Sequence, residues 1–257
     1  MLQTDIQMIL CDVDGTLLPK GEHTLSDDVF DAIRYATSAG VKVVIASGRS
    51  HVDLENLFSP VTASIYLIAG DGGLTMKNGQ IITLSSIHYS TVENMFAVTE
   101  NQTDICCVLY TSAGIFGLGK HVPDSVPAQI SCLSEISGDI YKVAFYQPND
   151  FLTFKLRSFA QRSRKLKEVY QDKNWLEFVD FGTDKGVACQ KLQDLSGIPS
   201  ERTAAFGDNF NDFGMLRRAR MTFASATAVP EIKRMCKKIS YHIPNEIIKL
   251  SQERGTL

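Results

Sequence analysis

Four short apolar runs, each followed at once by small or acidic residues, constrain the fold of this chain more than any other feature. They span residues 8–11, 41–46, 65–69 and 203–207, and they precede Asp12, Ser47, Gly70 and Asp208. Apolar, β-prone runs of this length are typical of buried parallel strands. In open α/β sheets the ligand crevice lies outside the carboxyl ends of the strands. The four runs therefore predict that these polar ends converge on one site.

The first of these ends carries two carboxylates, Asp12 and Asp14, followed by Gly15. Their i, i+2 spacing can direct both side chains toward one pocket, and glycine lets the chain turn sharply after them. Carboxylates are costly to remove from water unless a cation or hydrogen-bond donors meet them. The pair therefore indicates a site lined by a cation or donors, although taken alone it also fits a polar turn after a strand.

The composition is that of an ordinary globular protein, with 257 residues, 44% hydrophobic and 21% charged. This length allows one large domain or two small ones. The net charge of -3 leaves no basic surplus for nucleic acid, and the basic stretch 157–167 is typical of a solvated helix end and loop. No run approaches membrane-spanning length, and no signal core is evident at the start. We expect a cytoplasmic protein with neither a nucleic-acid nor a membrane partner.

The six cysteines lack the paired spacing of metal ligands and the density of a disulfide-rich scaffold. Three of them, Cys11, Cys106 and Cys107, lie in apolar runs and are predicted to be buried small hydrophobic residues. This usage favours a reduced cytosolic enzyme.

Residues 1–82 alternate between strand and helix patterns. Helices are predicted over 26–39, where Gly40 is the stop signal, and over 51–58. The Asn78-Gly79 pair between two apolar stretches predicts a hairpin, because these residues accept positive φ at low cost. Such alternation predicts an α/β fold, a Rossmann-like doubly wound parallel sheet with helices on both faces.

Residues 83–181 have a different pattern, in which strands dominate. The predicted strands are 105–111, 115–118, 140–147, 166–171 and 175–181, with helices near 91–100 and 150–162. This order suggests an antiparallel α+β layer covered on one face. No strand end in it repeats the acidic signature, so we interpret the segment as an inserted α+β cap domain. A lid over a polar site excludes water and contacts the leaving group, whereas a structural or dimerising insertion is the alternative.

Alternation of helix and strand resumes in residues 182–257, which complete the predicted core. The predicted elements there are a strand at 221–224, a helix near 229–237 and a strand at 239–241.

Four short motifs occur in a fixed order along the chain. They are Asp12-Val13-Asp14-Gly15-Thr16, Ser47-Gly48-Arg49, Lys185-Gly186 and Gly207-Asp208-Asn209-Phe210-Asn211-Asp212. Together they resemble the haloacid dehalogenase-like (HAD) phosphatase superfamily. The long interval between the second and third motifs, with the sequence of 195–199, resembles the Cof-type sugar-phosphatase branch, whose class IIB cap lies in that interval.

Hydrolysis of a phosphate monoester needs a nucleophile, charge neutralisation and a proton for the leaving oxygen. Asp12 is the best nucleophile candidate, because a carboxylate can form an aspartyl-phosphate intermediate. Asp208 adds a second carboxylate for a hard cation that prefers oxygen, which favours Mg²⁺. The resemblance implies that Asp14 gives its backbone carbonyl to the metal. Its side chain then protonates the leaving group and afterwards deprotonates the attacking water.

The remaining candidates are groups that would bind phosphate or support the site. Ser47 and the Gly48 amide can donate hydrogen bonds to the phosphoryl group, and Lys185 adds positive charge. Taken alone, Ser47-Gly48 also fits a helix N-cap, and Lys185 a solvated helix residue. The family resemblance further assigns phosphate binding to Val13 and Asn211 and supporting roles to Arg49 and Asp212, the latter as a residue that orients Lys185 or metal-bound water.

Position 71 departs from the Cof-type pattern. The third strand in that branch commonly ends in Asn-Gly, whereas here Asp71 stands before Gly72. An amide can donate a hydrogen bond to a substrate, and an ionised carboxylate cannot. Asp71 is therefore expected to favour a substrate hydroxyl or amine, unless it is only a turn residue.

The sequence thus predicts a Mg²⁺-dependent phosphatase that hydrolyses a small phosphorylated metabolite, such as a sugar phosphate, as a monomer or homodimer. A phosphomutase shares the first half-reaction and is the alternative enzyme. A receiver-like protein that only accepts a phosphoryl group is the non-enzymatic alternative, but receivers are much shorter and lack an inserted domain.

Overall fold

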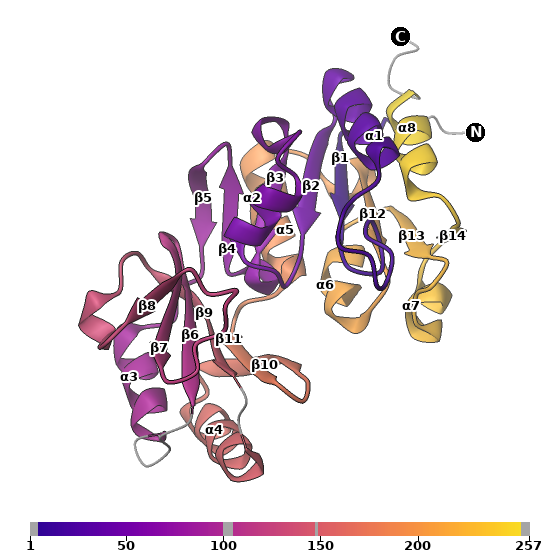
Figure 1. Cartoon of the computed structure of the whole chain (residues 1–257). Coiled ribbons are helices and arrows are strands. Elements are labelled where there is room, and N and C mark those ends of the chain that lie inside the picture. Colours follow the sequence, from indigo (N-terminus) through magenta and orange to yellow (C-terminus); the bar gives the residue numbers. More distant parts are fainter. Residues whose placement is uncertain (1–4, 100–104, 147–148, 253–257) are drawn as a thin grey trace. The chain divides into compact units, whose positions relative to one another are not determined.

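The structure is a computed structural model that describes residues 5–99, 105–146 and 149–252 (Figure 1). The described chain divides into two compact units. The core unit contains the residues up to Thr83 and those from Asp184 onward, and the inserted unit runs from Leu84 to Thr183. Within the described ranges, no helix combines the length and the apolar character needed to cross a membrane.

The core unit is built on an eight-stranded sheet with the order β14-β13-β12-β1-β2-β3-β4-β5. All neighbours from β14 to β3 are parallel, and β4 pairs antiparallel with β3. The strands are β1 (Met8–Cys11), β2 (Lys42–Ala46), β3 (Tyr66–Ala69), β4 (Leu74–Lys77), β5 (Gln80–Leu84), β12 (Thr203–Gly207), β13 (Met221–Ser225) and β14 (Lys238–Ser240). The four predicted runs thus form β1, β2, β3 and β12, which are adjacent in the sheet, so their ends lie along one edge.

Helices cover both faces of this sheet. On one face, α5, α6 and α7 contribute to an apolar cluster with β1, β2, β12 and β13. On the other face, α1 packs against α8 and β2, and α2 packs against β3 (Figure 1). Their bounds are α1 (Asp27–Ser38), α2 (His51–Leu57), α5 (Lys185–Ser196), α6 (Phe213–Leu216), α7 (Pro230–Met235) and α8 (Ile243–Gln252). The prediction of a doubly wound sheet is confirmed.

The inserted unit is a six-stranded sheet with the order β10-β11-β9-β6-β7-β8. Its pairs are antiparallel except β7–β8, which is parallel. The elements are α3 (Tyr89–Ala97), β6 (Cys106–Thr111), β7 (Gly114–Gly119), β8 (Ala128–Ile130), β9 (Ile140–Tyr146), α4 (Asp150–Ser163), β10 (Leu166–Gln171) and β11 (Trp175–Asp180). Residues of α3 and α4 share one apolar cluster with the sheet, so both helices cover the same face, as predicted.

Most predicted elements end within one or two residues of the observed ones. The hairpin between β4 and β5 has positive φ at Asn78 and Gly79, as the residue pair predicted. Glu100 and Gln147, predicted ends of a helix and a strand, lie outside the described residues. Helix α8 was not predicted, although Ile243, Ile247 and Leu250 have helical spacing and are buried.

Candidate active site

The ends of neighbouring strands bring Asp12, Ser47 and Asp208 to one edge of the core sheet. The amide of Asp12 donates to the Phe206 carbonyl at 3.0 Å, and the amide of Ser47 donates to the Ile68 carbonyl at 2.9 Å. The sheet ladder therefore continues into the first residue after β1 and after β2, whereas the Asp208 amide donates to Asp212 Oδ2. This fixes the backbone from which the three polar side chains project.

A buried lysine lies at the centre of the site. Lys185 Nζ donates to Asp12 Oδ1 and to Asp212 Oδ1, each at 2.7 Å, and the lysine side chain is 1% exposed. Lys185 is the first residue of α5, whose N-cap Asp184 accepts a hydrogen bond from the Gly186 amide at 2.7 Å. The alternative of a solvated helix residue is therefore wrong, because folding buries this ammonium between two carboxylates.

Asp212 holds both the lysine and the loop that follows β12. Its Oδ2 accepts from the Asp208 amide at 2.9 Å and from the Asn209 amide at 3.1 Å, while its Oδ1 accepts from Lys185. Both oxygens of Asp212 are thus occupied by donors. This favours the predicted role of orienting Lys185 over direct ligation of a metal.

Burial and charge act in opposite directions on the ionisable groups of the site. The pKa of Asp12 is raised to about 7, mainly by burial, with Asp212 and Asp208 also raising it and Lys185 opposing them. Burial by itself would lower the pKa of Lys185, but Asp12, Asp212 and Asp71 raise it above its ordinary value. Burial and the neighbouring Asp212 also raise the pKa of Asp208. The excess of carboxylates over cations indicates a site that needs further positive charge.

Asp12, Asp208 and Asp212 each have one carboxylate oxygen in a group whose members lie within 4.8 Å of one another. Asp12 Oδ2 is buried and accepts no hydrogen bond from any described residue. An unpartnered buried carboxylate oxygen beside a second carboxylate suits a hard divalent cation. Asp12 and Asp208 therefore fit Mg²⁺, whereas the side chain of Asp14 is not part of this group.

Asp14 is instead paired with Arg49 of the second motif. Arg49 Nε donates to Asp14 Oδ2 at 2.9 Å, and Arg49 Nη2 donates to Asp14 Oδ1 at 2.7 Å. The hydrogen bonds to Asp14 raise the pKa of Arg49, so the guanidinium keeps its charge. This bidentate pair fixes the orientation of the Asp14 carboxylate, which is half exposed.

Asp71 contacts residues of both the second and the fourth motif. The Asp71 amide donates to the Ser47 carbonyl at 3.0 Å, and Asp71 Oδ1 accepts from Asn211 Nδ2 at 3.2 Å. A Cβ on Gly48 would lie 2.9 Å from Asp71 Oδ2, so the glycine makes room for this carboxylate. Asp71 is buried, with a left-handed φ of 53° that Asp tolerates better than most residues. Its contacts exceed those of a simple turn residue.

Two further residues contribute to the site that the motifs did not predict. Lys20 Nζ lies 3.5 Å from Asp208 Oδ2, on a side chain that is 62% exposed. Nothing in its local sequence distinguishes Lys20 from other surface lysines. Asp184 did have a signal, since an Asp directly before a helix start is a typical N-cap.

The candidate phosphate-binding residues Val13, Ser47 and Gly48 follow β1 and β2, the two strands that pair in the middle of the sheet. Ser47 is buried, and its Oγ accepts from the Arg49 amide at 3.2 Å. Its N-cap alternative is not supported, because Ser50, rather than Ser47, caps α2.

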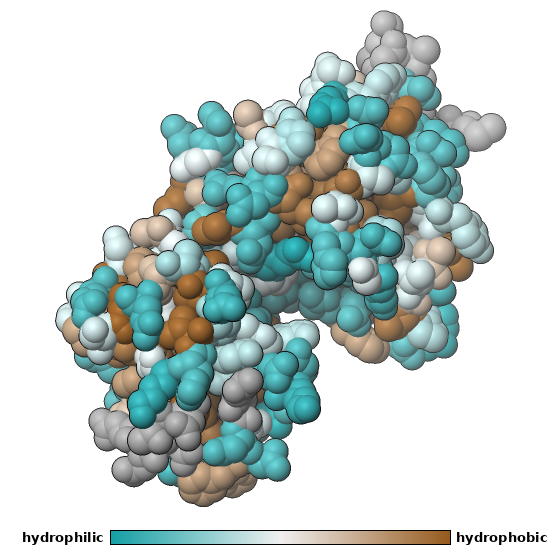
Figure 2. Space-filling view, in the orientation of Figure 1, coloured by the Kyte–Doolittle hydropathy of each residue, from teal (hydrophilic) through white to brown (hydrophobic). Residues whose placement is uncertain are grey.

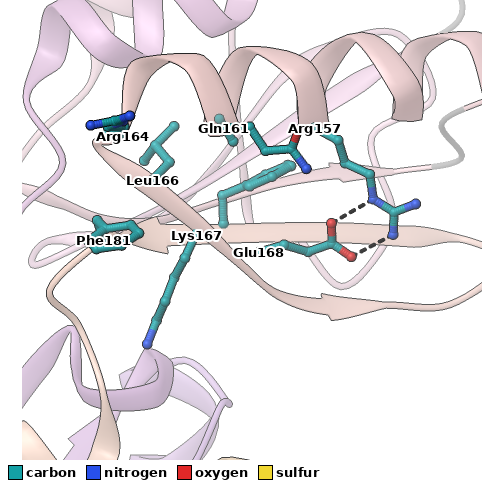
Figure 3. Close-up of a pocket in the computed structure, with 9 residues that line it drawn as sticks. Arg157, Gln161, Arg164, Leu166, Lys167, Glu168 and Phe181 are labelled. Atoms are coloured by element: carbon teal, nitrogen blue, oxygen red, sulfur yellow. Dashed lines mark hydrogen bonds and ion pairs between the residues drawn. The ribbon is translucent and has the colours of Figure 1, made fainter.

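The inserted unit has a cavity of its own, of about 310 Å³, between α4 and the strands β10 and β11 (Figure 3). Arg157 on its wall pairs with both oxygens of Glu168, at 2.7 and 2.6 Å. Phe181, Arg164 and Lys167 also line it. It contains no cluster of carboxylates like the one in the core unit.

Residues 9–246 match the sequence profile of the haloacid dehalogenase-like hydrolase family. Putative phosphatase YxeH of Bacillus subtilis is 26% identical over 247 residues, covering 88% of this chain and 89% of that protein. HMP-PP phosphatase of Yersinia pseudotuberculosis is also 26% identical, covering 86% of this chain and 84% of that protein. The chain therefore belongs to the haloacid dehalogenase-like hydrolase family.

The solved structure of the HAD subclass IIB sugar phosphatase BT4131 has a TM-score of 0.73 to this chain and 20% identity, covering 98% of this chain and all of that one. The fold of this chain is therefore that of the solved structure, and the family match makes the chain a haloacid dehalogenase-like hydrolase. The predictions of family, fold class and enzyme class are confirmed.

Proposed function

We propose that this protein is a Mg²⁺-dependent phosphatase that hydrolyses a small phosphate monoester through an aspartyl-phosphate on Asp12. One observation carries the proposal: the buried Lys185 bridges Asp12 and Asp212 at the carboxyl edge of the sheet, and the second oxygen of Asp12 has no partner among the described residues. A structural salt bridge would be expected to satisfy both oxygens of a buried carboxylate. An unpartnered oxygen beside Asp208 fits a nucleophile and metal ligand instead.

In this mechanism Asp12 attacks the phosphorus atom while the leaving oxygen departs in line. Mg²⁺ bound by Asp12, Asp208 and the Asp14 carbonyl would neutralise the phosphate charge that otherwise repels the nucleophile. Lys185 adds a fixed positive charge, and Ser47 and the Gly48 amide donate hydrogen bonds to the phosphoryl oxygens. Val13 and Asn211 complete the proposed phosphate site.

Asp14 is the proposed acid and base of the reaction. It gives a proton to the departing oxygen, and then takes one from the water that hydrolyses the aspartyl-phosphate. The bidentate contact with Arg49 holds the ionised Asp14 carboxylate at a defined position, which suits the base step, whereas the acid step requires a protonated Asp14 that this contact disfavours. Asp212 supports the chemistry through Lys185.

Chelation is the first test of the metal assignment. A strong chelator should abolish phosphate release, and added Mg²⁺ should restore it. Full activity in the sustained presence of the chelator would refute a catalytic metal.

The two carboxylates of the first motif have separable expected phenotypes. Asp12→Asn should form no covalent intermediate, because an amide is a poor nucleophile. Asp14→Asn should still be phosphorylated slowly by an ester with a good leaving group, and should then fail to hydrolyse the intermediate. Rapid-quench trapping and mass spectrometry of intact protein distinguish the two. Near-normal turnover by Asp12→Asn would mean that the nucleophile is misassigned.

We propose that the inserted unit acts as a cap that selects the substrate, and that the substrate is a sugar phosphate or similar metabolite. The relatives carry different substrate names, among them HMP-PP phosphatase and a sugar phosphatase, so family membership alone does not select one. A phosphomutase would retain the phosphoryl group on an organic product. Release of inorganic phosphate from a panel of metabolite phosphates tests which ester is the substrate and whether the enzyme is a phosphatase or a phosphomutase.

A further inference from the structure

An exposed lysine of the core unit approaches one of the two carboxylates proposed to bind Mg²⁺. Lys20 Nζ lies 3.5 Å from Asp208 Oδ2, and the two side chains are 62% and 3% exposed. In the part of the chain that the structure describes, Lys20 is the one cation within ion-pair distance of Asp208. Lys20 and a metal ion bound by this oxygen would therefore share one partner.

A tight turn in the loop between β1 and α1 positions the backbone of Lys20. The Glu22 amide donates to the Pro19 carbonyl at 3.1 Å, and Gly21 has a φ of 91°. Positive φ at the third residue of a turn closed in this way is the type II pattern, in which glycine is strongly preferred. The buried Leu18 anchors the start of the turn in the core unit. The loop lies on the face turned to the viewer in Figure 1, and Figure 2 shows hydrophilic residues on that part of the surface.

The carboxylate of Asp208 has little freedom to turn away from Lys20. The backbone amide of Asp208 donates to Asp212 Oδ2 at 2.9 Å, and its carbonyl accepts from the Val229 amide at 2.9 Å. A Cβ on Gly15 would overlap Asp208 Oδ2, so this oxygen lies directly against the backbone of the first motif. The oxygen is therefore held at the site, and the exposed lysine is the partner that can move.

Lys20 and Mg²⁺ would compete for this oxygen. Mg²⁺ binds carboxylate oxygens at about 2.0–2.1 Å, so an ammonium 3.5 Å from the same oxygen would lie within about 6 Å of the metal. A double and a single positive charge at that separation repel each other even in water. Mg²⁺ binding must therefore either displace the lysine from Asp208 or overcome its repulsion, and both lower the affinity for the metal.

The second lysine of the site, Lys185, differs from Lys20 in both burial and partners. Lys185 is 1% exposed and donates to Asp12 Oδ1 and Asp212 Oδ1, whereas Asp12 Oδ2 accepts no hydrogen bond from any described residue. It therefore leaves that oxygen of Asp12 free for a metal and cannot move into solvent. Lys185 is a permanent cation of the site, and Lys20 is a displaceable one.

We propose that Lys20 is a displaceable counter-ion of Asp208 that sets the affinity of the core unit for Mg²⁺. The proposal rests on the phosphatase function proposed above, because it takes Asp12 and Asp208 as the metal ligands. The ammonium holds Asp208 Oδ2 until Mg²⁺ binds and then moves into solvent, so one cation replaces the other and no covalent bond changes. A neutral side chain at position 20 should therefore tighten Mg²⁺ binding, and salt should reduce the difference because it screens an exposed charge.

Titration calorimetry with MgCl₂ at low ionic strength tests the proposal. The Kd of Lys20→Met for Mg²⁺ should be about three- to fivefold lower than that of the wild type, and that of Lys20→Arg, which keeps the charge, should stay within about twofold. Lys237→Met, at an exposed lysine of the same unit, is the matched control for lost charge and should leave the Kd unchanged. Equal or weaker binding by Lys20→Met would overturn the proposal, as would an equal gain in Lys237→Met.

Thermal unfolding gives a second readout that does not depend on activity. A ligand that binds only the folded state raises Tm more when its affinity is higher, so a fixed Mg²⁺ concentration should raise the Tm of Lys20→Met more than that of the wild type. This excess should shrink at about 0.5 M NaCl, and an excess that salt leaves unchanged would refute competition between charges. If the wild type binds no Mg²⁺ in either assay, the metal assignment of the proposed function fails. If it binds Mg²⁺ with the same Kd as Lys20→Met, only the role of Lys20 fails.

Discussion

Lys185→Met tests whether the buried lysine holds the carboxylates of the core unit together. The ammonium is 1% exposed and is the shared donor to Asp12 and Asp212. Methionine fills a similar volume but carries no charge. The variant therefore leaves the buried carboxylates of Asp12 and Asp212 side by side without their shared cation. Breaking a buried ion pair by removing one partner typically costs about 3–5 kcal/mol.

The loss of unfolding free energy should depend on pH, because one of the two carboxylates can bind a proton and so relieve the repulsion between them. Asp12, with its raised pKa, is the carboxyl expected to take it. The ordinary pKa of Asp is 3.8. Protonating the carboxyl therefore costs about 4.4 kcal/mol at pH 7 and about 1.6 kcal/mol at pH 5, at ~1.36 kcal/mol for each pH unit above that pKa. The folded variant then binds more protons than the unfolded chain, so its free energy of unfolding falls as pH rises from 4 to 7.

Urea unfolding in the presence of a chelator, at pH 5 and pH 7, measures this difference. The only tryptophan, Trp175, lies in the inserted unit, so hydrogen exchange of β1 and β12 peptides should report on the core unit. Lys237→Met, at an exposed lysine of the same unit, is the control and should change stability by less than about 0.5 kcal/mol. An equal loss at the two pH values would refute the charge argument and point to lost packing.

Four further substitutions have defined outcomes. Asp208→Asn should weaken Mg²⁺ binding at least about tenfold by calorimetry, since a neutral amide replaces a charged ligand; unchanged affinity would exclude it as a ligand. Asp71→Asn should alter relative kcat/KM among natural esters by about ten- to hundredfold without changing Mg²⁺ dependence, and an unaltered profile would make Asp71 purely structural. Burial lowers the pKa of His51 below its ordinary value of 6.5, so the unfolded chain binds a proton more readily than the folded one. The free energy of unfolding of the wild type, measured with urea, should therefore fall as the pH drops below 6.5, and that of His51→Asn should change less. Gly186→Ala would place a Cβ 2.3 Å from the backbone of Gly214, so the melting temperature should fall markedly, and an unchanged value would contradict the close packing of α5 on α6.

Local sequence patterns were sufficient for the architecture of the core. β-prone runs stand directly before Asp12, Ser47 and Asp208, and local helix patterns predicted α1, α2 and α7. These features act over a few residues, so they can be read before any long-range contact is known. The same approach gave no bounds for α5 or α6, and it missed α8, whose apolar residues follow directly after β14. It also missed the parallel strand β8, which is only three residues long.

The sequence by itself predicted which residues carry chemistry, because the order of the motifs and the residue types within them are local. Only the tertiary structure decided their partners. Arg49 meets Asp14 across 35 residues, Lys185 meets Asp12 across 173, and the exposed Lys20 approaches Asp208. The reason is that strand order brings distant ends together, and burial then makes each charge depend on the neighbour that the sheet supplies.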